Sequence, residues 1–308
     1  MLIGRFAPTP SGHLHLGSIA TAVGSYLCAR NKSGLIFLRI EDLDTPRCKT
    51  AYTKSILEDL NLLGFRFDGQ VVYQSERSDF YKKVLLDLLH ARCAYYCACT
   101  RKELKISSCN CYLKDIKPQS HLAIRFKSAL ALVDNFYDQL KGFVRTSLDD
   151  ENQLHMVLRR SDNIVAYNLA CVVDDIAQGV TEIVRGSDLI DITPLQILLY
   201  KNLKFLQEKG LLDSLKDYKI EIPNYIHLPL VKMNDEKKYS KQNHAIAALS
   251  LGSPQDVLFT CLKFLNQDVS YIRSDLTPKQ ILDEAQKRFS IKKIPKSDKI
   301  ISSLDHIK

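Results

Sequence analysis

The chain has 308 residues, of which 45% are hydrophobic and 25% charged, a balance typical of a globular protein with a substantial core. No apolar run approaches the ~20 residues that cross a bilayer, and no export signal is apparent, so the composition excludes a membrane-spanning protein and predicts a cytoplasmic one. Lysine and arginine outnumber aspartate and glutamate by 43 to 35, and the net charge of +8 permits a polyanionic partner such as RNA without requiring one.

The first predicted strand leads into a loop that is dense in proline, glycine and histidine. The apolar run MLIGRFAP suits a short buried strand, RFAPTPSGHLHLGS continues it as a loop, and IATAVGSYLCAR has the apolar spacing of a helix. A strand-to-helix loop is where an α/β sheet receives ligands, because the helix N-terminus presents unpaired N–H groups to an anion. A rigid turn with two surface histidines is the alternative.

Strand and helix patterns then alternate. GLIFLRIEDLDTPR reads as an apolar strand that ends in acidic residues and a turn. YTKSILEDLNLLGF and FYKKVLLDLLHARCAYY, the latter at residues 80–96, both repeat apolar residues at helical spacing. This alternation predicts a parallel sheet.

Cysteines cluster directly after these helices. Of the nine in the chain, Cys93, Cys97, Cys99, Cys109 and Cys111 fall in one short window, which in a cytoplasmic protein indicates a metal rather than disulfides. The last four form two C-x-C pairs, and four thiolates can surround Zn²⁺ tetrahedrally. Cys93 is expected to be a core residue on a helix face. Free thiols without a metal are the alternative.

The pattern is irregular over residues 107–150, as expected of an insertion that splits the sheet. Regular structure resumes with a strand at 156–159, a helix around 166–173, a strand at 180–185 and a helix from Thr193. A lysine-rich loop, VKMNDEKKYSKQNHA, follows the apolar IHLPLV, and the tail from about Ser253 indicates mainly short helices.

Two motifs far apart in the sequence carry a resemblance to a known family. HLGS at residues 15–18 and KYSKQ from Lys238 resemble the ATP-binding motifs HIGH and KMSKS of class I aminoacyl-tRNA synthetases. RFAPTPSGHLHLGS, RIEDLDTPR, YNLACVVDDIAQGVTEIVRGSDL and KYSKQNHA resemble the glutamyl and glutaminyl group, and most closely its short members that link glutamate to queuosine in tRNA(Asp). The similarity covers residues 2–248. Ser18 stands for the second histidine of HIGH and Tyr239 for the methionine of KMSKS.

The resemblance implies that an amino-acid carboxylate attacks the α-phosphate of ATP and that Mg²⁺ bridges the phosphates. His15 and Lys241 would stabilise the negative charge that develops in the transition state, and Lys238 would hold the pyrophosphate end. The ATP-binding set is completed by Gly17, Ser18 and Ser240.

The resemblance also implies a site for L-glutamate. Arg5 and Arg185 would pair with its two carboxylates, and Glu41 would hold its α-ammonium. Tyr167 would hydrogen-bond its side chain. The relatives line the same pocket at the positions of Ala7 and Thr9. A strand-end carboxylate is the alternative reading of Glu41, and a surface ion pair that of Arg185.

The relatives bind zinc in the insertion, many through two cysteines followed by a tyrosine and a third cysteine four residues apart. This chain departs from that pattern, because Ser107 stands at the tyrosine position if Cys111 is the last ligand, while Tyr112 lies just beyond. The site is expected to use Cys97, Cys99, Cys109 and Cys111, and the choice between Cys109 and Tyr112 stays open.

The implied fold is α/β: a Rossmann-type parallel sheet, split by a zinc-binding insertion and followed by a short, mainly helical region. The expected divisions are the first half of the catalytic domain at 1–92, the insertion at 93–153, the second half at 154–200, a connecting region with the KMSKS-like loop at 201–252 and a helical tail at 253–308. Full glutamyl-tRNA synthetases carry a helical anticodon-binding region for which the residues after Lys241 are too few.

The expected activity is therefore tRNA-independent activation of L-glutamate with ATP and transfer of the glutamate to the queuosine base in the anticodon of tRNA(Asp), by a monomer. A reduced glutamyl- or glutaminyl-tRNA synthetase that charges a tRNA 3′ end is one alternative, which the missing region disfavours. A non-catalytic RNA-binding paralogue is the other, which the intact motifs disfavour.

Overall fold

The computed structural model describes residues 1–100, 102–114, 116–131, 133, 135–145, 155–232 and 246–300. Its N-terminal part alternates strand and helix, as the apolar spacing predicts. Three parallel strands pair in the order β1-β2-β3, and helices α1 and α2 connect them. Their bounds are β1 Ile3–Phe6, α1 Leu16–Asn31, β2 Leu35–Ile40, α2 Thr50–Leu62 and β3 Val72–Tyr73.

A second group of strands continues beyond β1. Its order is β7-β6-β10-β9, with β10 parallel to both neighbours and β7 antiparallel to β6. The Thr181 backbone N–H donates to the Ile3 carbonyl at 2.8 Å, which places β9 beside β1. The bounds here are β6 Asn135–Asp138, β7 Gly142–Arg145, α5 Tyr167–Ala177, β9 Glu182–Gly186, α6 Thr193–Glu208 and β10 Asn224–Leu228. The expected parallel sheet is confirmed.

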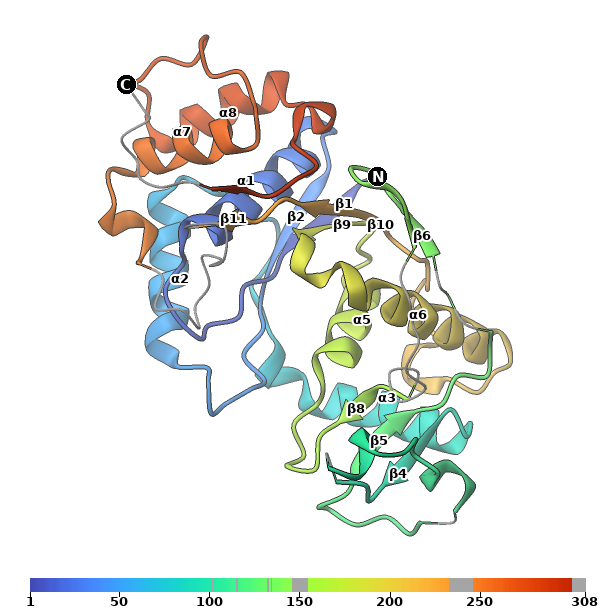
Figure 1. Cartoon of the computed structure of the whole chain (residues 1–308). Helices are drawn as coiled ribbons and strands as arrows, with labels where there is room; N and C mark the ends of the chain where they lie inside the picture. The colour runs from blue at the N-terminus through green and yellow to red at the C-terminus, as the bar shows by residue number, and fades with distance from the viewer. Residues whose placement is uncertain are drawn as a thin grey trace.

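The segment between the two halves builds a small antiparallel sheet of its own. β5 pairs with β4 on one side and β8 on the other, at the end of the molecule away from α7 and α8 (Figure 1). The bounds are α3 Ser78–His90, β4 Ala94–Cys97, β5 Ala123–Phe126 and β8 Val157–Arg159. β6 comes from the same segment but pairs with β10 through Asp138 and Tyr225. The proposed domain boundaries stay a prediction.

The prediction of helix over residues 80–96 is wrong at its end. α3 stops at His90, and Arg92 adopts a positive φ of 56°, which turns the chain into β4. Cys93 lies in this connection and not on a helix face, although it is buried as expected. The apolar residues keep their helical spacing beyond His90, so the spacing alone does not reveal the turn at Arg92.

The C-terminal helices α7 (Pro254–Phe264) and α8 (Pro278–Arg288) begin with capping boxes and pack against α1. Figure 1 shows them, in orange and red, side by side at one end of the molecule. A short strand, β12 (Lys299–Ile300), pairs with β11 (Val231–Lys232). The tail is therefore mainly helical, as predicted.

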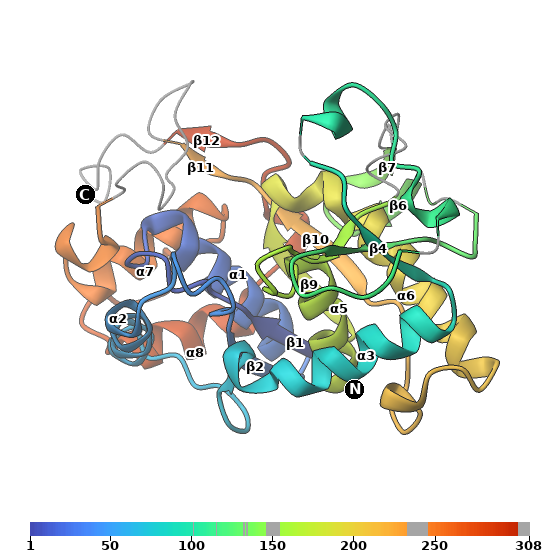
Figure 2. The ribbon, with the colours of Figure 1, turned by 90° about the horizontal axis from the view of Figure 1, so that it is seen from below.

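Two large apolar cores hold the fold together. One joins α1 and β2 to α2, α7 and α8, and the other joins α3, α5 and α6 to the antiparallel sheet. Figure 2 shows these groups of elements on opposite sides of the molecule, with β1, β9 and β10 between them. Among the described residues no helix is long and apolar enough to cross a membrane.

Candidate active site

All six residues expected to bind an amino acid line one cavity of about 350 Å³. They come from both halves of the sheet and meet near the carboxyl ends of β1, β2 and β9, where α/β sheets receive ligands. The six are Arg5, Ala7, Thr9, Glu41, Tyr167 and Arg185. The structure thus brings together residues that lie far apart in the sequence.

Arg5 is held in place by the buried carboxylate of Asp175. Its Nε donates to Asp175 Oδ1 at 3.2 Å and its Nη1 to the Val184 carbonyl at 3.3 Å. Arg39 Nη1 also donates to Asp175 Oδ1, at 2.6 Å. Burial by itself would raise the pKa of Asp175, but Arg39 and Arg5 hold it below its usual value. Asp175 therefore stays ionised and fixes the direction of Arg5.

Glu41 is 7% exposed and faces the same cavity, so its carboxylate is not an ordinary strand-end group. Its Oε1 accepts from Arg39 Nη2 at 3.3 Å. Burial raises the pKa of Glu41, while Arg39 and Arg5 oppose that shift. An ammonium group in the cavity would stabilise the ionised form of this carboxylate.

Arg185 is 4% exposed, which rules out the alternative of a surface ion pair. Its Nη1 donates to Gln196 Oε1 at 2.8 Å and its Nη2 to Thr193 Oγ1 at 2.8 Å. Its Nε donates to His227 Nε2 at 3.1 Å, and the guanidinium lies over the Tyr225 ring. Within the described residues these contacts use three of the five N–H groups of a guanidinium, and two remain for a ligand carboxylate.

The first ATP motif forms the N-terminus of α1. His15 is the N-cap residue, and its Nδ1 accepts from the Ser18 backbone N–H at 3.3 Å. Ser18 Oγ also lies 3.0 Å from His15 Nε2. A Cβ on Gly17 would approach the His15 ring to 3.3 Å and the Val231 Cβ to 3.6 Å, so the backbone here lies close to both side chains.

The second motif, with Lys238, Ser240 and Lys241, lies outside the described residues. The chain enters that segment from β11, whose Val231 lies next to Gly17. It resumes at Ile246, and the Ala248 backbone N–H donates to the Leu14 carbonyl at 2.9 Å. Both ends of the segment are therefore attached beside the loop that carries His15.

A second cavity adjoins the first, and a third adjoins the second. The second, of about 370 Å³, shares Thr9, Glu41 and Tyr167 with the first and continues past Asp44 and Arg160. Arg160 Nη1 lies 3.3 Å from Asp44 Oδ2.

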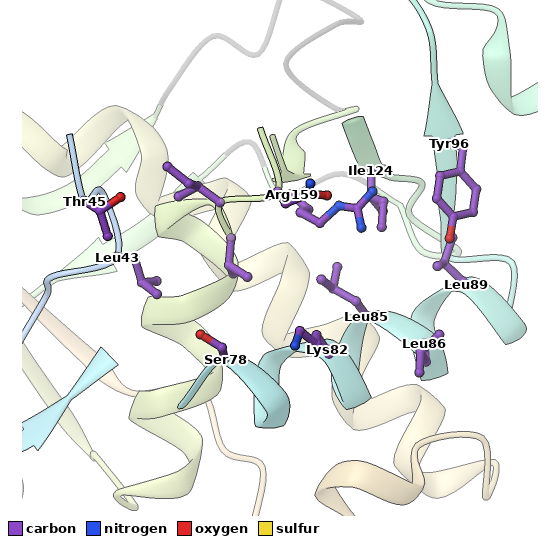
Figure 3. Close-up of a pocket in the computed structure, with 13 residues that line it drawn as sticks. Leu43, Thr45, Ser78, Lys82, Leu85, Leu86, Leu89, Tyr96, Ile124 and Arg159 are labelled. Carbon is purple, nitrogen blue, oxygen red and sulfur yellow. The ribbon is translucent and has the colours of Figure 1, made fainter. Parts of the chain in front are cut away.

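The third cavity, of about 510 Å³, shares its wall residues Leu43, Ile164 and Val165 with the second. Figure 3 shows that Leu85 of α3 and Arg159 of β8 border this third cavity. The three cavities form a row from Arg185 to α3.

The four predicted cysteine ligands converge. Their sulfur atoms all lie within 4.8 Å of one another, with Sγ–Sγ distances of 3.5 Å between Cys97 and Cys109 and 3.4 Å between Cys99 and Cys111. Four sulfurs at about 2.3 Å from a tetrahedral Zn²⁺ are about 3.8 Å apart, so this group fits the ion.

Tyr112, the alternative ligand, is engaged elsewhere. Its ring stacks on His155 with centroids 5.0 Å apart and lies under Lys127 Nζ at 5.0 Å. Ser107 is exposed. The arrangement favours the set of four cysteines, which could hold a metal ion.

The comparison with protein families decides the relationship of this chain. Residues 1–110 and 112–267 match the model of the tRNA synthetases class I (E and Q), catalytic domain. The chain belongs to this family. It is accordingly an α/β enzyme of the class I aminoacyl-tRNA synthetase type.

Its relatives include short synthetases of almost the same length. The glutamyl-Q tRNA(Asp) synthetase of Photorhabdus laumondii is 40% identical over 304 residues, which cover 97% of this chain and 90% of that one. The enzyme of the same name from Escherichia coli K12 is 40% identical over 301 residues, 96% of this chain and 91% of that one. That of Yersinia pestis is 42% identical over 298 residues, 95% and 87%.

Solved structures show the same fold. A glutamate tRNA ligase from Elizabethkingia meningosepticum, crystallised in complex with its amino acid, has a TM-score of 0.75 at 23% identity and matches 98% of this chain and 67% of that one. The glutamate-tRNA synthetase of Elizabethkingia anophelis has a TM-score of 0.74 at 24% identity, with 98% and 68% covered.

Several residues that shape the site were not predicted from the sequence. Asp175 accepts hydrogen bonds from Arg5 and Arg39, while His227 and Gln196 accept from Arg185. The available signal was a charged or polar residue inside an otherwise apolar run, as in LIFLRI, VVDD and IHLPLV. Such residues are buried only when a partner satisfies them.

Proposed function

We propose that this protein activates L-glutamate with ATP and transfers it to the queuosine base in the anticodon of tRNA(Asp). The observation that carries the proposal is the cavity in which Arg5, Arg185 and Glu41 meet. Two cations and one anion complement the two carboxylates and the ammonium of glutamate. Relatives about 40% identical over nearly the whole chain are named for this activity.

In the first step a glutamate carboxylate oxygen attacks the α-phosphorus of ATP, the bond to the bridging oxygen breaks, and pyrophosphate leaves. Arg5 and Arg185 fix the amino acid, and Glu41 holds its ammonium. His15 and Lys241 stabilise charge on the phosphate oxygens, and Lys238, Gly17, Ser18 and Ser240 complete the ATP site. Mg²⁺ bound with ATP would supply positive charge that neutralises the phosphates.

In the second step a hydroxyl of the acceptor attacks the glutamyl carbonyl, an ester forms, and AMP leaves. The cavity beside Asp44 and Arg160 shares Thr9, Glu41 and Tyr167 with the glutamate cavity, so an acceptor placed there would lie next to the activated carboxyl. Queuosine offers a base-linked cyclopentenediol whose hydroxyls resemble those of a ribose. Positioning supplies the main effect, because the adenylate is already activated.

Zinc belongs to the same proposal. Cys97, Cys99, Cys109 and Cys111 would bind one Zn²⁺ and so fix β4 to the loop that precedes β5. The role is structural, because four thiolates leave no open coordination position. We place the protein in the cytoplasm, where tRNA is available, as a monomer.

The test of the acceptor uses the purified protein with ATP, radiolabelled glutamate and total tRNA from queuosine-containing and queuosine-lacking cells. Label should appear only in the first tRNA. Periodate is not a fair control, because it cleaves both the ribose and the cyclopentenediol. Enzymatic removal of the 3′ adenosine is the proper one. Loss of labelling after that trimming would identify a conventional 3′-end synthetase instead, and no labelling with either tRNA would contradict the proposed transfer.

A further inference from the structure

A buried chain of hydrogen bonds runs from β6 to the cavity proposed for glutamate. Asp138 on β6 and His227 on β10 are both fully buried, and Asp138 Oδ2 lies 2.7 Å from His227 Nδ1. His227 Nε2 in turn lies 3.1 Å from Arg185 Nε. The far end of this chain is the guanidinium that faces the cavity.

The chemistry of arginine assigns the proton on the imidazole. Arg185 Nε can only donate, so His227 Nε2 must accept, and the ring proton therefore lies on Nδ1 and is donated to Asp138. Asp138 is itself held in place, because Oδ2 also accepts from the His227 backbone N–H at 2.9 Å. Its Oδ1 accepts from the backbone N–H groups of Leu140 and Lys141, at 2.9 and 2.7 Å.

The surroundings keep His227 neutral. Burial and the positive charges of Arg185 and Lys141 lower its pKa, while Asp138 opposes that shift. The other side chains against the ring are Tyr225 and Phe136, with centroids 6.0 and 5.9 Å away, and the Thr193 hydroxyl at 3.0 Å from Nε2. A protonated ring would carry a proton on Nε2 and could no longer accept from Arg185.

We propose that His227, oriented by Asp138, is a positioning residue that aims Arg185 at a glutamate carboxylate. The inference rests on the proposed glutamate activation and deepens it. Gln196, Thr193 and His227 hold three edges of the guanidinium, so its remaining N–H groups are already directed when the substrate arrives. Without His227 the substrate would bind only after Arg185 is ordered, and its affinity would fall.

Two substitutions separate the two hydrogen bonds of the imidazole. An asparagine amide reaches the place of Nδ1, so His227→Asn keeps a donor to Asp138 but removes the acceptor of Arg185. A glutamine amide reaches the place of Nε2, so His227→Gln keeps an acceptor for Arg185. Pyrophosphate exchange into ATP is measured against glutamate concentration for both variants and the unmodified protein.

We expect His227→Asn to raise the KM for glutamate by about 10-fold or more, with kcat changed by less than about 3-fold, as for a lost uniform binding interaction. His227→Gln should stay within about 3-fold of the unmodified protein. In an Arg185→Ala background His227→Asn should add no further loss, because coupled residues are not additive. Non-additive losses in the double variant distinguish a positioning role of His227 from a general loss of structure.

The pH profile is an independent readout. Because the pKa of His227 is lowered, the KM for glutamate of the unmodified protein should rise only at a pH below the usual histidine value of about 6.5, and His227→Gln should lack that rise. Equal KM for the two variants, additive losses with Arg185→Ala, or an unchanged pH profile in His227→Gln would each overturn the inference. If His227→Asn does not fold, the pH profile of His227→Gln decides. Absence of exchange by the unmodified protein would instead contradict the proposed function.

Discussion

Buried charges dominate the site at the scale of single residues. Arg5, Arg39, Asp175 and Arg185 are each less than 5% exposed, and each has partners of fixed geometry. Such groups cost free energy to bury, and they persist in a folded protein only where a partner or a ligand compensates that cost. Their concentration around one cavity indicates a site organised before its substrate binds.

Replacing Arg185 should weaken glutamate selectively. Arg185→Ala leaves a substrate carboxylate without its cation, and a broken buried charge pair of this kind costs at least about 2 kcal/mol, roughly a 30-fold loss in kcat/KM for glutamate. Pyrophosphate exchange measures the effect, and Arg159→Ala, which borders the third cavity, is the matched control. Equal use of glutamine and glutamate by the unmodified protein would contradict the assignment of the cavity.

Acid should destabilise the fold through His227. Its pKa in the folded protein is lowered by burial and by Arg185, so the unfolded chain binds a proton first as pH falls. The associated stability is fully present above about pH 6.5 and is lost progressively below it. The free energy of unfolding, measured in urea at pH 7.5 and 5.5, should fall less in His227→Gln. An identical fall in both proteins would assign the acid sensitivity to other groups.

At the scale of elements, the antiparallel sheet depends on few apolar contacts near its cysteine end. Among the described residues, the cluster around Cys97, Cys109 and Cys111 has only a few partly buried neighbours, which include Tyr95 and Leu104. A metal that joins β4 to the turn at Cys111–Leu113 would replace the missing core.

Elemental analysis should therefore find about one zinc per chain, and Cys97→Ser should lose it. Proteolysis within residues 98–122 should then become faster, because the turn would lose its attachment to β4. Cys48→Ser is the control, since Cys48 is half-buried and outside the cluster. Metal-free protein with unchanged proteolysis after Cys97→Ser would leave free thiols as the correct interpretation.

The end of α2 meets the start of α8 at a glycine. Gly64 has a φ of +79°, and a Cβ there would lie 2.7 Å from the Lys279 Cα. Gly210, with a φ of +68°, has no atom within 4 Å of such a Cβ. The first position therefore combines backbone strain with a steric clash, whereas the second has strain alone.

We expect Gly210→Ala to lower the free energy of unfolding by about 1 kcal/mol, the cost of the left-handed conformation. Gly64→Ala should lower it by at least about 2 kcal/mol more, since packed backbones cannot shift cheaply. Urea denaturation of both variants measures the difference. Equal losses would show that α8 can move away from α2.

The pattern of apolar residues in the sequence predicted some helices and strands and missed others. Periodicity predicted the helices α1, α2, α5 and α6 and the strands β1, β2, β8 and β9, because each buries one face or lies wholly in the core. It failed at the end of α3, where a single residue of positive φ turns the chain. It also did not show that β6 would join the central sheet, because strand partners are set by tertiary packing and not by local pattern.

The same limit applied to the site. Arg5, Glu41 and Arg185 were predicted through motifs, and the cavity brings them together. The sequence did not predict the buried partners His227, Asp138, Arg39 and Asp175. Which polar residues pair depends on the folded arrangement. For Lys238, Ser240 and Lys241 the roles stay predictions.

At the scale of the whole molecule, two apolar cores lie on opposite sides of β1, β9 and β10 (Figure 2). The glutamate cavity takes residues from both sides, with Arg5 and Glu41 from one and Tyr167 and Arg185 from the other. Glutamate bound there as proposed would contact both halves at once, and its binding would stabilise their arrangement.

The pairing of β6 with β10 has a consequence for how the protein is made. Asp138 and His227 are 89 residues apart, and a ribosome adding about 5–20 residues per second needs roughly 4–18 s to travel between them. Throughout that interval β6 can pair with β7 but not with β10, and the side chain of Phe136 has no Tyr225 ring to cover it. The open edge of this hairpin can pair with other nascent chains, so the central sheet closes only late in synthesis, after a period in which the growing polypeptide is exposed to aggregation.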